Sequence, residues 1–326
     1  MATPEETRLR DALSSALRHY EEVMDAPFPG QVVLSVMDHP EFCAFAHVEA
    51  GNVHLQASTG TVSALDQLWQ QALQNTDILQ CDGQPAAVDP QALTQVSLIW
   101  LLFHELEHFG LGHFEDTQSG PRIEAASPQT LGLITSAVPA FDPENVKAAP
   151  TSHLLKRQEM EADHEAIELV LEAYSADNWM GLRSRAACIS AVMILIEKAD
   201  ESTARPGQSH PKAATRLFQL LGHLAQLWQV PAQIKAQLAG RETIDPNDLP
   251  PDEEIAAYQR QVIIPVFADA LCLAKTVGAS NAVAELQDQV SFFRDLANAQ
   301  LGNMDALVTP GAKEWADLLA DAEARC

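Results

Sequence analysis

Apolar positions along this chain recur mostly with the spacing of helices and alternate only in one region near the start. Residues 5–24 and 62–74 each carry one apolar stripe at helical spacing. Between them lie three β-prone runs, QVVLSVM at 31–37, FCAFAHVE at 42–49 and NVHLQAS at 52–58, and AGN forms a hairpin turn between the last two. The pattern predicts an α+β protein, mostly α, with a small sheet ahead of its main helices.

Long apolar helices are predicted in the middle of the chain. The run QALTQVSLIWLLFHELEHFGLG has no Gly or Pro before Gly110 and is apolar on more than one face, which predicts a core helix of about five to six turns. Residues 156–174, KRQEMEADHEAIELVLEAY, and residues 181–200, GLRSRAACISAVMILIEKAD, predict two more helices. Residues 115–152 lack a clear period, and both a lid beside a functional site and a disordered linker are compatible with them.

Nearly every segment after residue 210 is helical in its pattern. The predicted helices are 211–228, 231–239, 252–277, 281–300 and 311–324. We therefore expect two regions. Residues 1–228 form a domain with the sheet and the apolar helices, and residues 229–326 form a helical C-terminal region that could bind a regulatory partner.

The string HELEHFGLGH at 104–113 contains the H-E-x-x-H pattern, formed by His104, Glu105 and His108. Residues four apart share one helix face, so the two imidazoles can bind one Zn²⁺ while Glu105 acts beside them as a general base. The alternative is a surface helix that carries these residues by chance. The apolar character of the helix argues against this alternative, because a charged residue buried in a core needs a partner and a metal ion supplies one.

A catalytic zinc site needs a third protein ligand and leaves its fourth position to water. Glu159 and Asp163 lie one turn apart on the predicted helix 156–174. Glu159 could bind the zinc, and Asp163 could accept the free N–H of a zinc-bound histidine and so fix its tautomer. A solvated acidic face is the alternative interpretation. We favour it for the other acids of this helix, Glu161, Glu165, Glu168 and Glu172.

HELEHFGLGH followed by QEMEAD resembles the HtpX, BepA and CAAX-prenyl-protease family of gluzincins, whose helices read HELxHxxxxH and ExxAD. SHPKAATRL at 209–217 is similar to a third element of that family, S/T-H-P-x-x-x-x-R-L/I. The resemblance covers about residues 95–225. It implies a zincin-like core with one zinc per chain, Glu159 as the third ligand and Asp163 as its outer partner. A sheet edge would then hold an extended substrate over the metal, although the pattern does not tell which strand is the edge.

The same resemblance implies that His210 lies close to the metal, where it stabilises the oxyanion or sits over the zinc. A helix-entry position is the alternative, with Ser209 as the N-cap and Pro211 as the first helical residue. Arg216 either pairs with an acid near the site or lies on the surface.

His113 also fits the family pattern, but it follows two glycines at the expected end of the helix, so we interpret it as structural. The metzincin pattern fails by one position, because Leu111 and Phe114 stand where it needs Gly and His. The remaining histidines have no partner pattern, and for these we expect ordinary core or surface positions: His19, His39, His47, His54, His153, His164 and His223.

The formal net charge of −25 makes nucleic acids and anionic membranes poor partners, because both are repelled by an acidic surface. The five cysteines are scattered and form no C-x-x-C, which is typical of reduced thiols in a cytoplasm. The start, MATPEETRLRDA, lacks the features of a signal peptide. The longest apolar runs are shorter than the roughly 18–20 residues of a membrane span. We therefore expect a soluble cytoplasmic protein.

These observations predict a soluble zinc-dependent endopeptidase that acts on protein or peptide substrates. Glu105 would take a proton from a zinc-activated water and pass it to the leaving amine. Three alternatives stay open. A weaker resemblance to the Lit phage-exclusion peptidase, a soluble H-E-x-x-H enzyme, implies cleavage of one host protein. The other two are a non-enzymatic regulator with a structural metal site, and a helical interaction protein without metal.

Overall fold

The structure, a computed structural model, describes residues 2–75, 77–81, 84–85, 88–114, 152–201, 203 and 207–323. This part of the chain is mostly helical with a small three-stranded sheet, as the apolar pattern predicts. The segment 115–152, predicted as either a lid or a linker, lies outside the described residues except for Ser152.

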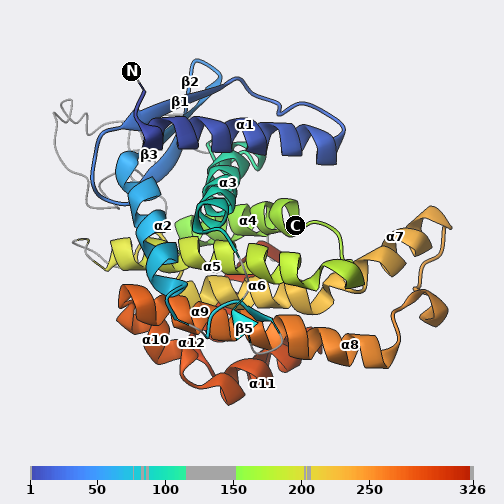
Figure 1. Cartoon of the computed structure of the whole chain (residues 1–326). Coiled ribbons are helices and arrows are strands. Elements are labelled where there is room, and N and C mark those ends of the chain that lie inside the picture. Colours follow the sequence, from blue (N-terminus) through green and yellow to red (C-terminus); the bar gives the residue numbers. More distant parts are fainter. Residues whose placement is uncertain are drawn as a thin grey trace, which may run out of the picture.

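The N-terminal helix and the sheet lie on the same side of the molecule (Figure 1). Helix α1 (Pro4–Met24) begins after Thr3, whose hydroxyl accepts a hydrogen bond from Glu6 N at 3.1 Å, and the helix packs on α3. Strands β1 (Val32–Met37), β2 (Ala44–Glu49) and β3 (Asn52–Ser58) form the sheet in the order β1-β3-β2. Strand β3 runs parallel to β1 and antiparallel to β2, so β2 is an edge strand among those that the structure describes.

Helix α2 (Thr59–Ala72) follows β3 without a loop, and its first turn hydrogen bonds with the segment before β2. Gly60 N donates a hydrogen bond to the carbonyl of His39 at 2.8 Å. A Cβ on Gly60 would lie only 2.3 Å from the backbone of Pro40, so glycine is required here by close approach. Beyond α2, β4 (Gln80–Cys81) and β5 (Gln84–Pro85) form a short ladder in a region that the sequence pattern predicts as loop.

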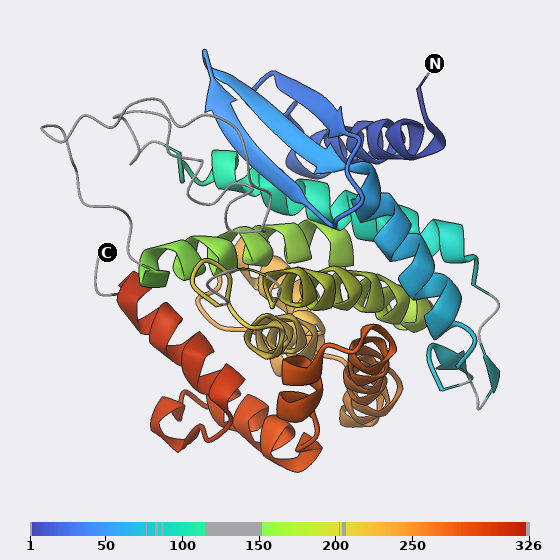
Figure 2. The same ribbon diagram turned by 90° about the vertical axis from the view of Figure 1, so that its left-hand side faces the viewer.

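Helix α3 (Pro90–Gly110) runs between the sheet and the helices α4 (Ser152–Leu171) and α5 (Trp179–Asp200) (Figure 2). It contacts α1, α2, α4 and α5, which explains why its sequence is apolar on more than one face. The predicted central helix is therefore confirmed. Its position lets residues on its different sides face the sheet and α4 at the same time.

Helix α5 is long and apolar enough by length and composition to cross a membrane, in contrast to the expectation from its sequence. The window that qualifies lies within Ala176–Asp200, and 72% of it is buried inside the protein. Core helices of soluble proteins pass the same test. Because α5 packs on α3, α6 and α9, its apolar surface is already covered by protein.

The C-terminal half is all-helical in the described residues, with α6 (Ala213–Leu227) and α9 (Ile264–Val277) packed on α5. Around them lie α7 (Val230–Leu238), α8 (Asp252–Tyr258), α10 (Ser280–Leu286), α11 (Gln289–Gln300) and α12 (Pro310–Glu323). Short 3₁₀ turns occur at Ala176–Asn178, Pro246–Asp248 and Met304–Ala306.

Two predicted helices of this half differ in detail from the structure. The predicted helix 252–277 is continuous but contains a π-helical turn at Gln259–Ile263, just before Pro265, which has no N–H to donate. The predicted helix 281–300 is divided near Asp288, whose carboxylate accepts a hydrogen bond from Ser291 N at 3.0 Å and so caps α11.

One hydrophobic core extends from Leu9 in α1 to Ala312 in α12 and includes both predicted regions. A buried ion pair between Arg183 and Asp269, at 2.7 Å, joins α5 to α9. The expected boundary between residues 228 and 229 stays a prediction.

Candidate metal centre

Three imidazole nitrogens converge on the carboxylate of Glu159. Nε2 of His104 lies 3.2 Å and Nε2 of His210 3.5 Å from Glu159 Oε2, and Nε2 of His108 lies 3.4 Å from Oε1. Zinc bonds of about 2.0–2.1 Å place adjacent ligands of a tetrahedral ion about 3.4 Å apart. The nitrogen-to-oxygen distances here are therefore those that a single ion requires, and His104, His108 and Glu159 form one of the clusters able to hold a metal.

The donor set also fits a metal in its electrostatics. Glu159 Oε2 is buried beside the nitrogens of His104 and His210, and an ionised carboxylate is costly to bury unless positive charge compensates it. Burial raises the pKa of Glu159, but His210, His104 and His108 outweigh it and hold that pKa well below its usual range. Burial lowers the pKa of His104, yet Asp163 and Glu159 raise it to about 10. Both shifts show that the two carboxylates require positive charge at this point.

Buried side chains orient the His104 ring on the side opposite Glu159. Its Nδ1 lies 2.9 Å from Asp163 Oδ1, and its ring stacks on that of Trp100 with centroids 5.6 Å apart. Arg216 of α6 binds both carboxylate oxygens of Asp163, at 2.6 and 2.5 Å. Arg216 is completely buried, so the surface alternative for this residue is wrong. The predicted residues of α3 and α4, together with Arg216, thus form one connected network.

A second chain of partners starts at His108 and was not predicted from the sequence. Nδ1 of His108 lies 2.9 Å from Nδ1 of His113, and Nε2 of His113 lies 3.1 Å from Glu161 Oε2. The other oxygen of Glu161 lies 3.3 Å from Arg157 Nε. Glu161 therefore contacts the network of the centre, whereas its sequence favours an interpretation as part of a solvated acidic face.

The end of α3 explains how His113 reaches His108. Gly112 has a positive φ of 71°, and His113 N donates to the carbonyl of His108 at 2.9 Å, which turns the chain back over the last helical turn. The two glycines at this helix end were thus the available signal for the role of His113. We interpreted them only as a helix stop.

Glu105 lies beside the candidate ligands His104 and His108 on α3 and faces the sheet. Burial is the largest effect on the Glu105 carboxyl group and raises its pKa to about 7, while His104 and a hydrogen bond with the Ala46 backbone act in the opposite direction. A carboxyl group with this pKa can hold or release a proton near neutral pH. Its contact with β2 identifies the strand closest to the reactive groups.

The free edge of β2 presents backbone groups near Glu105. Ser58 N donates to Cys43 O at 2.9 Å, and paired residues of an antiparallel ladder alternate in their hydrogen bonding. Ala44, Ala46 and Val48 therefore direct their N–H and C=O groups away from β3. Within the described part of the chain, no strand pairs with this edge, so it can accept an extended peptide.

His210 lies in the segment before α6, opposite Glu159. Its Nδ1 is 2.9 Å from Ser209 Oγ, and burial lowers its pKa. The predicted N-cap role of Ser209 is wrong, because α6 begins at Ala213 and Glu197 accepts the hydrogen bond from Ala213 N at 2.5 Å. The His210 ring therefore contacts Ser209 through Nδ1 and Glu159 through Nε2.

The sequence model of the family described as Peptidase U49 matches residues 15–228, a range that contains every residue of this centre. No curated protein and no solved structure matches the chain. The family match agrees with the Lit-type alternative and does not confirm the assignment to the HtpX and CAAX-prenyl-protease type. Because the matched range covers more than half of the sequence, the chain belongs to the Peptidase U49 family.

Proposed function

We propose that this peptidase is a zinc-dependent endopeptidase in which His104, His108 and Glu159 bind the metal. The observation that carries the proposal is the convergence of three imidazole nitrogens on the buried carboxylate of Glu159. When bound, zinc supplies Lewis-acid chemistry, since it makes a water molecule acidic near neutral pH and polarises a carbonyl oxygen. The surrounding residues would transfer the proton and hold the metal ligands in place during peptide hydrolysis.

Glu105 acts as the general base in this proposal. Its raised pKa of about 7 allows it to take a proton from the attacking water and then to donate that proton to the leaving nitrogen. Asp163 and Arg216 hold the His104 ring in place, while His113 and Glu161 do the same for His108. A thiol nucleophile is a poorer alternative, because burial raises the pKa of nearby Cys43 to about 12.

The substrate segment binds as an extended strand along β2 in this proposal. Ala44 and Val48 offer outward N–H and C=O groups and Ala46 offers its C=O group, and backbone pairing with such an edge is sequence-tolerant. The Ala46 backbone also hydrogen bonds with Glu105. A peptide paired with β2 would therefore have one of its carbonyl groups next to both the base and the metal ligands.

We further propose a narrow range of protein substrates, as in the Lit-type peptidases that the family match favours. The chain has a formal net charge of −25 and pI of about 4.6, which suits a substrate region with a basic surface. Localisation in the cytoplasm, with reduced thiols, also belongs to this proposal.

One observation supports a second candidate function, a non-enzymatic regulator with a closed metal site. His210 Nε2 lies 3.5 Å from Glu159 Oε2, close enough to become a fourth protein ligand that leaves no position for water. The raised pKa of Glu105 favours the enzyme, because a structural site needs no base near neutral pH.

The Glu105→Gln variant tests the proposal. We expect it to keep one equivalent of zinc at the centre, measured by elemental analysis, and to lose cleavage of cellular proteins, measured by proteomic detection of new N-termini. Glu107→Gln is the matched control, since Glu107 lies on the same helix, is also buried and has a pKa raised by burial to about 7. Cleavage that survives in Glu105→Gln would refute the assigned base. Absence of cleavage by the wild type, with zinc bound by four protein ligands, would favour the regulator.

A further inference from the structure

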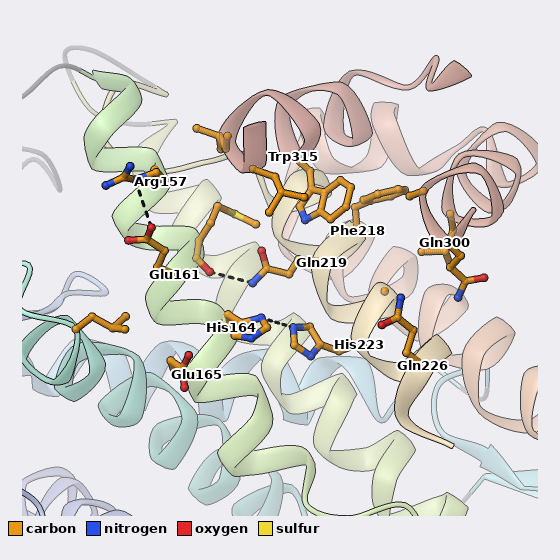
Figure 3. Close-up of a pocket in the computed structure, with 17 residues that line it drawn as sticks. Arg157, Glu161, His164, Glu165, Phe218, Gln219, His223, Gln226, Gln300 and Trp315 are labelled. Atoms are coloured by element: carbon orange, nitrogen blue, oxygen red, sulfur yellow. Dashed lines mark hydrogen bonds and ion pairs between the residues drawn. The ribbon is translucent and has the colours of Figure 1, made fainter. Parts of the chain in front are cut away.

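A pocket of about 550 Å³ lies between α4, α6 and the C-terminal helices α11 and α12 (Figure 3). Much of its lining is apolar and includes Phe218 and Trp315. Two histidines of the pocket lining point toward one another, His164 from α4 and His223 from α6, as Figure 3 shows. Neither residue takes part in the metal centre described above.

The two histidines and one acid form a compact cluster with metal-binding chemistry. His223 Nε2 lies 2.8 Å from His164 Nδ1, and Glu168 Oε1 lies 3.6 Å from His164 Nε2 and 4.0 Å from His223 Nδ1. The two distances to the carboxylate are near the separation of about 3.4 Å between adjacent ligands of a tetrahedral zinc ion. All three residues offer ligand atoms within 4.8 Å of one another.

Glu168 is more than half exposed and can reorient at little cost, because its side chain has a relative exposure of 60%. The i,i+4 spacing of His164 and Glu168 places both on one face of α4.

We propose that His164, His223 and Glu168 form a second divalent-cation site, which takes zinc or a similar borderline-soft ion with two nitrogens and one oxygen as ligands. The fourth position is left to water. The ion would bind to the nitrogens that face Glu168, which are Nε2 of His164 and Nδ1 of His223. Each neutral ring then carries its proton on its other nitrogen, so the hydrogen bond between His164 Nδ1 and His223 Nε2 is lost and the two rings move apart on binding. This site is independent of the proposed peptidase activity.

The position of the site gives the ion a structural consequence. It connects α4, which carries Glu159 and Asp163, to α6, which carries Arg216. An ion bound to both helices stabilises the folded state, because it binds that state and not the unfolded chain. We therefore expect the thermal midpoint to rise with zinc concentration beyond the concentration that fills the first centre.

Zinc titration of the full chain, after removal of metal by a chelator, tests the proposal. We expect the wild type to bind two equivalents by calorimetry and elemental analysis. His164→Gln and Glu168→Gln should each weaken the second equivalent by at least about tenfold. The matched controls are His153→Gln on the same helix and Glu172→Gln directly after its end, and both should bind zinc as the wild type does.

A count and affinity that are the same in the wild type, in His164→Gln and in Glu168→Gln would overturn the second site. Failure of the proposed peptidase centre gives a different result. In that case the equivalent assigned to His104 and His108 is missing, yet the His164 variant still loses zinc relative to the wild type. In crystals with zinc, anomalous scattering should give a peak between His164 and His223, and a map without that peak at saturating zinc would also overturn the proposal.

Discussion

Arg216 and Asp163 form a two-point ion pair in which both side chains are completely shielded from solvent, with contacts of 2.6 Å and 2.5 Å. Asp163 also lies 2.9 Å from the ring of His104, and the guanidinium of Arg216 lies 5.8 Å from the centre of the Trp100 ring. One arginine of α6 therefore fixes the orientation of a histidine on α3 through a carboxylate on α4. A buried pair of this kind contributes to orientation more reliably than to net stability.

Replacement of Arg216 by methionine should therefore be strongly destabilising. It leaves the buried carboxylate of Asp163 with one partner fewer, and we expect the free energy of unfolding to fall by about 3–5 kcal/mol. Urea denaturation of the metal-free protein measures this loss. The control is Arg10→Met, because Arg10 forms an exposed i,i+4 pair with Glu6, and such surface pairs contribute about 0–1 kcal/mol. Equal losses in the two variants would contradict the special role of Arg216.

Local pattern was sufficient to predict the principal elements that hold the candidate centre. The apolar stripe of α3 and the helical pattern of α4 set which faces are buried. The i,i+4 spacing then placed His104 with His108 on one helix and Glu159 with Asp163 on the other. These patterns do not predict that α3 and α4 pack against one another at these residues. Only the resemblance to a family with the same order of motifs predicts this contact, and the structure brings the four residues together.

Contacts that depend on how distant helices pack were not predictable in the same way. Arg216 is buried because α6 packs against α4 and α5, and no periodicity in α6 distinguishes a buried arginine from a surface one. His164 and His223 are far apart in sequence but meet across the same pair of helices. The segments of β4 and β5 are too short to show a period of two residues.

Glu161→Gln should weaken zinc binding at the candidate centre without unfolding the protein. Glu161 contacts His113, and His113 contacts His108, so the substitution removes the negative charge that supports the orientation of one ligand. Loss of such an outer partner typically lowers metal affinity by about 10–100-fold. Competition with a chromogenic chelator measures the affinity, and Glu172→Gln is the control with the same change of charge. Unchanged affinity would show that His108 is oriented by other contacts.

Gly60→Ala should destabilise the protein, whereas Gly222→Ala should leave it as stable or make it more stable. The added methyl group at position 60 meets the Pro40 backbone at 2.3 Å, and overpacking of this kind costs about 1–3 kcal/mol or more. No atom lies within 4 Å of the corresponding position at Gly222. Because Gly222 lies inside α6, alanine there gains about 0.5–1 kcal/mol of helix propensity. Thermal denaturation compares the two variants, and a tolerated alanine at 60 would mean that the segment before β2 can move.

His223 should make the stability of the metal-free protein depend on pH below neutrality. Burial, and then His164, lower its folded-state pKa to about 4, compared with about 6.5 in the unfolded chain. Below pH 6.5 the His223 ring is protonated in the unfolded chain but stays neutral in the folded protein. The contribution of His223 to the free energy of unfolding is therefore fully present above pH 6.5 and is lost as the pH falls toward 4. Linkage gives a loss of at most about 3 kcal/mol. Urea denaturation in the presence of a chelator measures this loss. Between pH 7 and pH 4 we expect the free energy of unfolding of the wild type to fall by about 1–3 kcal/mol more than that of His223→Gln. Parallel profiles for the wild type and His223→Gln would mean that the ring is protonated in the folded protein at a pH well above 4.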